Sequence, residues 1–304
     1  MKRELQNQKG GAGSPLPAAD GAHGVTRPTN IRIGNQTSFA AAVLEPFEFA
    51  VANGFTAFEF FPDRGHSGIG GWHENDLGEV DRRAIRQKAR ENDLELMVHA
   101  PLEFNPVVSA DDTRLHSTVD FAHALGATLV NLHLDTSRGV DRFAEALGPA
   151  LRITAEAGLK LAVENTVWTG PQDFNHFFAV LPRGKVPSAH CGMCFDLGHA
   201  NLFGATQNNY WKYFDALGAD VPVIHLHLHE NFGDRDSHLT LFTGPSRTNS
   251  AGMVGFLDRL SQRKFSGCAI LEQWPQPPSL LVNARDGLEK LVAASRQSAA
   301  IKKM

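Results

Sequence analysis

The chain has 304 residues, of which 42% are hydrophobic and 20% charged, and a formal net charge of −4. These values describe an ordinary globular protein large enough for one substantial core. The acidic balance argues against nucleic acid as a partner. No apolar run approaches the ~18 residues of a membrane span, so we expect no membrane contact. No apolar segment follows Lys2 and Arg3, so we expect no signal peptide either.

The cysteine content favours a reducing compartment. Three cysteines are too few for a disulfide framework, so we expect a cytoplasmic protein. Cys191 and Cys194 have the C-x-x-C spacing of a redox motif or of half a zinc site. Because no second cysteine pair exists to complete a zinc site, we interpret them as small apolar residues of a buried strand.

The N-terminal segment differs from the rest of the chain. Residues 1–28 are rich in Gly, Ala, Pro and Gln and show no hydrophobic periodicity. A segment of this composition cannot bury a core, so we expect a flexible tail that can be deleted without loss of stability. Residues 29–304 are then the folded domain.

After the tail, short apolar segments alternate eight times with helical segments. Parallel strands that are buried on both faces have this apolar character. The predicted strands are Ile31–Gly34, Ala57–Phe61, Leu94–His99, Thr128–Leu134, Leu159–Glu164, Cys191–Asp196, Val223–His229 and Cys268–Glu272. A glycine that leads directly into the next strand follows three of the predicted helices, Ser38–Asn53, Thr113–Leu125 and Val140–Ala157.

Eight such units in about 270 residues indicate an α/β fold, a single (β/α)8 TIM barrel. The rival is a doubly wound open sheet, which usually carries a glycine-rich phosphate-binding turn after its first strand. The segment IRIGNQTSF lacks the G-x-G-x-x-G pattern of that turn, so the closed barrel is the preferred prediction.

Six consecutive predicted strands end on a side chain that can ligate a metal ion. In a TIM barrel the carboxyl ends of the strands meet at one mouth, where active sites lie. Buried charges are costly unless they are paired or bound to metal. Imidazoles and carboxylates without thiolates suit zinc, manganese or iron. The six residues are His99, His133, Glu164, Asp196, His227 and Glu272.

Two short spacings extend this set. Asp196 and His199 form D-x-x-H, and Asp236 and His238 form D-x-H in the loop after the seventh strand. In the segment HLHLHEN, the two-residue period of a strand places three histidines on one face. His227 is the predicted ligand among them. His225 fills a deeper layer of the barrel or packs, and His229 contacts substrate or packs.

With these motifs the chain resembles the xylose isomerase-like TIM-barrel superfamily, which contains endonuclease IV and many sugar isomerases and epimerases. The resemblance extends from Ile31 to about Ser295. The sugar epimerase branch implies one divalent metal ion held by Glu164, Asp196, His227 and Glu272. The endonuclease IV branch implies a trinuclear zinc centre with the further ligands His99, His133, His199, Asp236 and His238.

The expected cofactor is thus one to three divalent ions, Mn or Zn, with Fe or Co as alternatives. The preferred function is isomerisation or epimerisation of a small sugar, keto-polyol or sugar phosphate. In it Glu164 and Glu272 remove and return the proton next to a metal-polarised carbonyl. His199 holds a substrate oxygen. Four aromatic residues near the mouth are candidates to cover the sugar: Trp168, Trp274, Phe60 and Trp72.

Two other functions are compatible with the sequence. The first is phosphoester hydrolysis at a metal cluster of the endonuclease IV kind, which the five further ligands favour. The second is a catalytically silent sugar-binding barrel, which the complete ligand set argues against. The number of metal ions distinguishes the first two, since one ion favours isomerisation and three favour hydrolysis. The sequence leaves open whether the chain forms a homo-oligomer.

Overall fold

A computed structural model describes residues 31–38, 40–63, 71–110, 112–181 and 190–301. The proposed tail, residues 1–28, lies outside these residues. None of the helices in the described part is long and apolar enough to cross a membrane.

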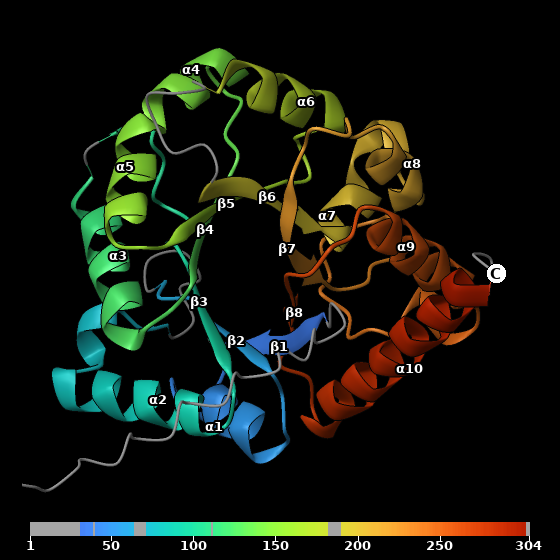
Figure 1. The fold of residues 1–304 in the computed structure, drawn as a ribbon, viewed down its shortest axis with the longest axis horizontal. Coiled ribbons are helices and arrows are strands. Elements are labelled where there is room, and N and C mark those ends of the chain that lie inside the picture. Colours follow the sequence, from blue (N-terminus) through green and yellow to red (C-terminus); the bar gives the residue numbers. More distant parts are fainter. Residues whose placement is uncertain (1–30, 39, 64–70, 111, 182–189, 302–304) are drawn as a thin grey trace, which may run out of the picture.

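The strands form a closed barrel in which each is parallel to its neighbours and β1 pairs with β8. Figure 1 looks along the barrel, with the strands at the centre and the helices around them. The TIM-barrel prediction is confirmed. The strands are β1 (Arg32–Gln36), β2 (Ala57–Phe60), β3 (Glu95–His99), β4 (Leu129–His133), β5 (Lys160–Glu164), β6 (Cys191–Asp196), β7 (Val223–Leu228) and β8 (Cys268–Leu271).

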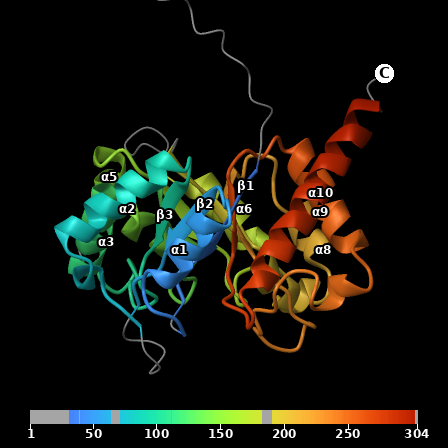
Figure 2. The same cartoon turned by 90° about the horizontal axis from the view of Figure 1, so that it is seen from below.

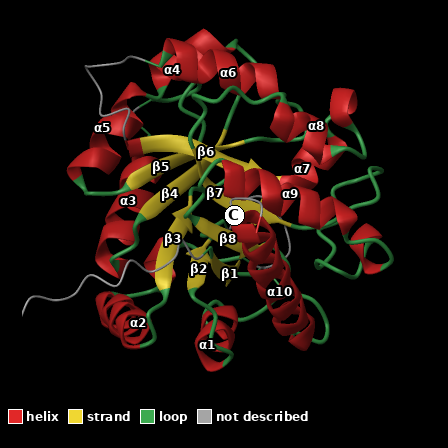
Figure 3. Cartoon of the chain, turned by 45° about the vertical axis from the view of Figure 1, so that its right-hand side comes forward, coloured by secondary structure: helices red, strands yellow, loops and turns green. Residues whose placement is uncertain are grey.

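Helices cover the outer face of the barrel on all sides, as Figure 3 shows by colour. In the side view of Figure 2, α9 and α10 lie against each other on one flank. The α-helices are α1 (Glu45–Ala52), α2 (Glu79–Glu91), α3 (Thr113–Leu125), α4 (Val140–Ala146), α5 (Gly148–Glu156), α6 (Pro171–Val180), α7 (Leu197–Leu202), α8 (Tyr210–Asp215), α9 (Ala251–Gln262) and α10 (Ser279–Ile301).

Proline accounts for two differences from the predicted helices. The first helix begins at Glu45 rather than Ser38, with Pro46 in its first turn, where a missing N–H costs nothing. The predicted helix Val140–Ala157 is divided into α4 and α5 at Leu147, because Pro149 again occupies the first turn of a new helix. The helix Thr113–Leu125 was predicted with the correct bounds.

The barrel interior has two layers with different chemistry. A small apolar cluster, separate from the main core, is formed by Ala57, Met97, Leu129, Ala162, Cys194, Cys268 and Ile270. Most of these residues lie two positions before a polar residue of the mouth, such as Ala162 before Glu164. Because alternate strand residues share a face, the apolar layer forms the floor beneath the polar layer.

Candidate metal centre

A cavity of about 360 Å³ opens at the carboxyl ends of the strands. Seven of the nine predicted metal ligands line it: His99, His133, Glu164, His199, Asp236, His238 and Glu272. The other two, Asp196 and His227, are fully buried. We call this cavity the metal cleft.

Four of the predicted ligands form a central group. The potential ligand atoms of Glu164, Asp196, His227 and Glu272 all lie within 4.8 Å of one another. His227 Nδ1 is 3.1 Å from Glu164 Oε2 and 2.9 Å from Glu272 Oε1. Three of these residues lie in the adjacent strands β5, β6 and β7, and Glu272 directly follows β8, so the barrel itself fixes the group.

Glu164 also belongs to a second group, with His99 and His133, whose ligand atoms again lie within 4.8 Å of one another. His99 Nε2 is 3.3 Å from Glu164 Oε2, and His133 Nε2 is 3.5 Å from Glu164 Oε1. The two groups therefore share one carboxylate.

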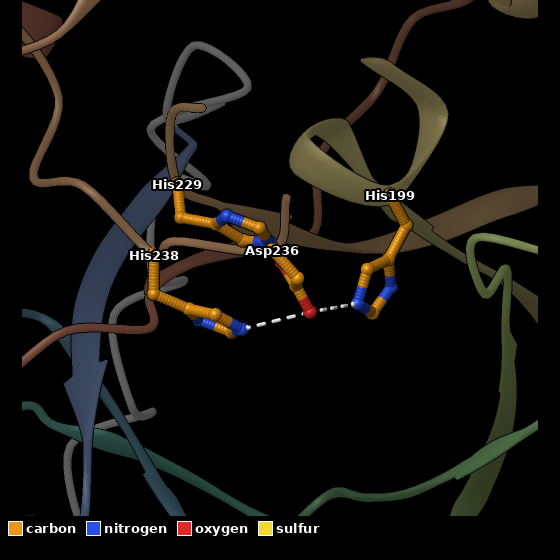
Figure 4. A group of neighbouring side chains, drawn as sticks. All are labelled: His199, His229, Asp236 and His238. Carbon is orange, nitrogen blue, oxygen red and sulfur yellow. Dashed lines mark hydrogen bonds and ion pairs between the residues drawn. The ribbon is translucent and has the colours of Figure 1, made fainter. Parts of the chain in front are cut away.

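The third group consists of His199, His229, Asp236 and His238. Figure 4 shows the Asp236 carboxylate between two imidazoles, with Oδ2 at 3.2 Å from His199 Nε2 and 3.3 Å from His238 Nε2. The His229 ring stacks on that of His238 with centroids 3.9 Å apart. Two chain segments far from each other in sequence thus supply this group.

Local backbone structure explains both short motifs. Asp196 is the N-cap of α7, and its Oδ1 accepts from the backbone N–H of His199, so D-x-x-H places both side chains at the mouth. After β7 the chain folds back, because Glu230 and Leu239 exchange two backbone hydrogen bonds. This fold-back returns Asp236 and His238 to the cleft.

His229 occupies a different place from the one expected for a substrate contact. It is fully buried beneath His238 and does not line the cleft. Its Nε2 is 3.2 Å from Asp196 Oδ1. A Cβ on Gly198 would meet this ring at 1.9 Å, so the glycine of D-L-G-H makes room for His229.

The donor set fits divalent cations. Six buried atoms of these groups have no hydrogen-bond partner: Asp196 Oδ2, Glu272 Oε2 and both ring nitrogens of His227 and of His229. Burial opposes the ionisation of Asp196, yet His199 and His229 outweigh it and lower its pKa. Burial also opposes the charging of His238, but Asp236 and Glu272 raise its pKa to about 9. Carboxylates and imidazolium groups thus neutralise each other at this site. A bound cation would displace the protons of the imidazolium groups and take over their role.

Glu59 of β2 is part of the site and was missed by the sequence analysis. It is fully buried, and its two oxygens lie 2.9 Å from His225 Nε2 and 2.9 Å from His227 Nε2. Burial opposes its ionisation, but the two histidines outweigh this effect and hold its pKa well below the ordinary value. A charged residue inside the apolar strand AFEF was the available signal.

The Glu59 carboxylate sets the orientation of His227. Glu59 Oε1 lies 2.9 Å from His227 Nε2, which favours a proton on Nε2 and leaves the lone pair on Nδ1, facing Glu164 and Glu272. The carboxylate beside one ring nitrogen in this way favours the other nitrogen for binding a metal.

We expect Glu59→Gln to weaken metal binding at the central group about 10- to 100-fold. An amide offers one oxygen where two imidazole N–H groups need acceptors, so His227 loses its fixed orientation. Chelator competition measures the affinity, and thermal unfolding tests the fold separately. The control is Glu230→Gln, because Glu230 is also buried but accepts from the backbone of Gly244 and Ser246. Equal metal affinities in both variants and the unmodified protein would contradict this role.

The candidate aromatic residues separate into three environments. Trp274 lines the metal cleft, whereas Trp168 is 84% exposed and lines a neighbouring groove. Phe60 and Trp72 are buried and pack on Phe121 in the core, so the prediction that they cover a substrate was wrong. Phe60, at the end of β2, faces outward toward α3, which the sequence pattern did not resolve.

Phe61 and Gln36 are among the residues of the cleft that were not predicted. Phe61 packs on His99 with ring centroids 4.4 Å apart, and Gln36 donates to Glu272 Oε1 at 3.1 Å. Cys191 and Cys194 are free and buried in β6 as expected. Burial raises the pKa of the Cys191 thiol to about 12.

Comparison with known proteins gives one relative named as an endonuclease and one relative without an assigned function. "Probable endonuclease 4" of Halobacterium salinarum is 26% identical over 210 residues, covering 62% of this chain and 74% of that protein. An uncharacterised protein of Methanocaldococcus jannaschii is 23% identical over 203 residues, 59% of this chain. The chain spans only 64% of the length of that second relative, just under two thirds.

Solved structures of an epimerase-like protein and of an endonuclease share the fold. A D-tagatose 3-epimerase-like protein superposes with a TM-score of 0.68 at 19% identity, covering 88% of this chain and 100% of that one. Endonuclease IV from Thermus thermophilus gives 0.60 at 22% identity, covering 86% and 99%. Identities this low establish the fold alone. The family model described as "Xylose isomerase-like TIM barrel" matches residues 47–296. The chain therefore belongs to the xylose isomerase-like TIM-barrel family.

Proposed function

We propose that this protein is a divalent-metal-dependent phosphoester hydrolase whose centre takes three ions. The observation that carries the proposal is the position of Glu164. Its carboxylate is shared by two ligand groups, and a third group lies beside them. The sequence alone favoured an isomerase; the assembly of all nine predicted ligands into three groups changes that preference.

Divalent ions supply Lewis acidity and activate water for attack on phosphorus. In hydrolysis the water oxygen bonds to phosphorus, the ester P–O bond breaks, and the departing alcohol oxygen takes up a proton. The protein holds the ion-binding groups at fixed spacing through strand ends and the loops that follow them. Asp196 and His227, which are fully buried, anchor the central group, whereas His133 and Asp236 face the open cleft.

Isomerisation or epimerisation of a small sugar, keto-polyol or sugar phosphate is the second candidate. Glu272 favours it, because this carboxylate lines the cleft and can approach a substrate. The second carboxylate of the proton shuttle is less suitable. Glu164 is 1% exposed. Its oxygens lie 3.1 to 3.5 Å from nitrogens of four imidazoles, His99, His133, His199 and His227. Such a carboxylate is placed to bridge cations rather than to collect a proton from carbon.

The walls of the cleft support a small substrate rather than long nucleic acid. Among the described residues that line it, none is Lys or Arg, and proteins that bind DNA neutralise its phosphates with such residues. We propose zinc or manganese as the ions, since the groups combine imidazoles and carboxylates. A cytoplasmic location agrees with three free, buried cysteines.

Metal analysis combined with paired assays tests the proposal. We expect three ions per chain in the purified protein, hydrolysis of phosphomonoesters or phosphodiesters, and no exchange of the proton next to the carbonyl of ketoses in deuterated water. One ion per chain together with such proton exchange would replace the hydrolase by the isomerase. Three ions with neither activity would contradict both candidates.

A further inference from the structure

A groove of about 380 Å³ adjoins the metal cleft and has no part in the chemistry described above. It lies between the loops that follow β3, β4 and β5. His133 and Leu102 line both the groove and the cleft. A molecule held at the His99–His133–Glu164 group can therefore extend into the groove, because the two cavities adjoin at His133 and Leu102.

Trp168 forms one side of the groove and is 84% exposed. An exposed indole beside a groove offers an apolar ring face to a bound molecule. The indole is not on a loose loop. The Trp168 backbone N–H donates to Thr166 Oγ1 at 3.3 Å, and the Thr166 N–H donates to Thr169 Oγ1 at 2.8 Å. These bonds hold the backbone of the turn that carries Trp168.

Asp135 forms the polar side of the groove. Its carboxylate accepts from the Asn105 amide and, at 2.6 Å, from the Ser137 backbone N–H. Among the described residues lining the groove, none is Lys or Arg. The Asp135 carboxylate therefore makes the groove unfavourable for a second phosphate and favourable for hydroxyl donors.

We propose that this groove binds the neutral sugar portion of the phosphoester whose phosphoryl group lies at the metal cleft. An aromatic face beside a carboxylate and an amide suits a sugar ring, which has C–H groups on its faces and hydroxyls on its edge. The inference rests on the proposed function for the position of the phosphoryl group. It names the substrate class as a sugar phosphoester rather than a polynucleotide.

Two phosphonates test this assignment, because their C–P bonds resist hydrolysis. Methylphosphonate reaches only the metal cleft, whereas a hexose carrying a methylenephosphonate reaches the groove as well. With the metal-loaded protein, we expect calorimetry to give at least about tenfold tighter binding of the hexose phosphonate, the effect of ~1.4 kcal/mol. Trp168→Ala should remove this advantage and leave methylphosphonate unaffected, and Trp168→Phe should retain most of it.

Three results would overturn the assignment: equal binding of both phosphonates, a loss in Trp168→Ala that is the same for both, or tighter binding of a nucleoside phosphonate than of the hexose compound. Failure of the hydrolase proposal gives a different result. Methylphosphonate would then not bind to the metal-loaded protein, whatever residue stands at position 168.

Discussion

Replacement of Glu164 by alanine is expected to reduce the metal content from three ions per chain to about one and to abolish hydrolysis. Glu164 belongs to two of the three ligand groups at the cleft, so among these three its loss leaves the group of His199, His229, Asp236 and His238 complete. We expect kcat/KM for a phosphoester to fall by at least about 1000-fold, which corresponds to ~4 kcal/mol of transition-state stabilisation.

Elemental analysis of the purified variant and a hydrolysis assay with added zinc or manganese measure the two effects. A suitable control is Asp141→Asn, because that carboxylate is 78% exposed and pairs with His176 outside the cleft. An alanine variant of Glu164 that keeps three ions would show that the shared carboxylate is not a bridge between metal positions.

Removal of the ions is the second large effect, and we expect it to lower Tm by about 15 °C. An ion present at 100 times its Kd adds about 2.7 kcal/mol to the free energy of unfolding, so three ions add about 8 kcal/mol. A domain of this size shifts by roughly 2 °C per kcal/mol. Without ions, imidazolium groups are the positive charges that lie closest to the buried carboxylates, as His227 does to Glu164 and Glu272.

Thermal unfolding before and after dialysis against a chelator measures this shift, and metal analysis verifies the removal. Addition of zinc or manganese should restore Tm, whereas addition of sodium at the same ionic strength should not. If Tm is unchanged in protein that is verified to be free of metal, the three groups do not hold structural cations.

Much of the fold was predictable because the boundaries of its helices are marked by residues that are close to them in the sequence. Glycines at 54, 126 and 158 adopt positive φ angles of 69°, 72° and 74° after their helices, which few other residues tolerate. Each marks a boundary without any knowledge of distant contacts. Two helix starts were predicted wrongly, near Pro46 and Pro149. The sequence did mark them, since proline is favoured in the first turn of a helix.

The contacts between side chains of the site were harder to predict from the sequence. Alternation along HLHLHEN placed three histidines on one face, but not their partners. His225 and His227 share Glu59, which precedes His225 by 166 residues, whereas His229 lies against Gly198 and His238. A contact across the barrel depends on closure of the sheet, and no pattern within one strand contains it.

The sequence by itself determined the eight-unit barrel and the chemical kinds of side chain at the mouth, because a buried strand end cannot hold a carboxylate or imidazole without a partner. Only the tertiary structure decided how those side chains are grouped. It made Glu164 a shared carboxylate, buried His229, assigned Phe60 and Trp72 to the core and brought Trp168 beside the cleft. The reason is geometric: ligand groups form between strands and loops far apart in the chain, at distances set by closure of the barrel.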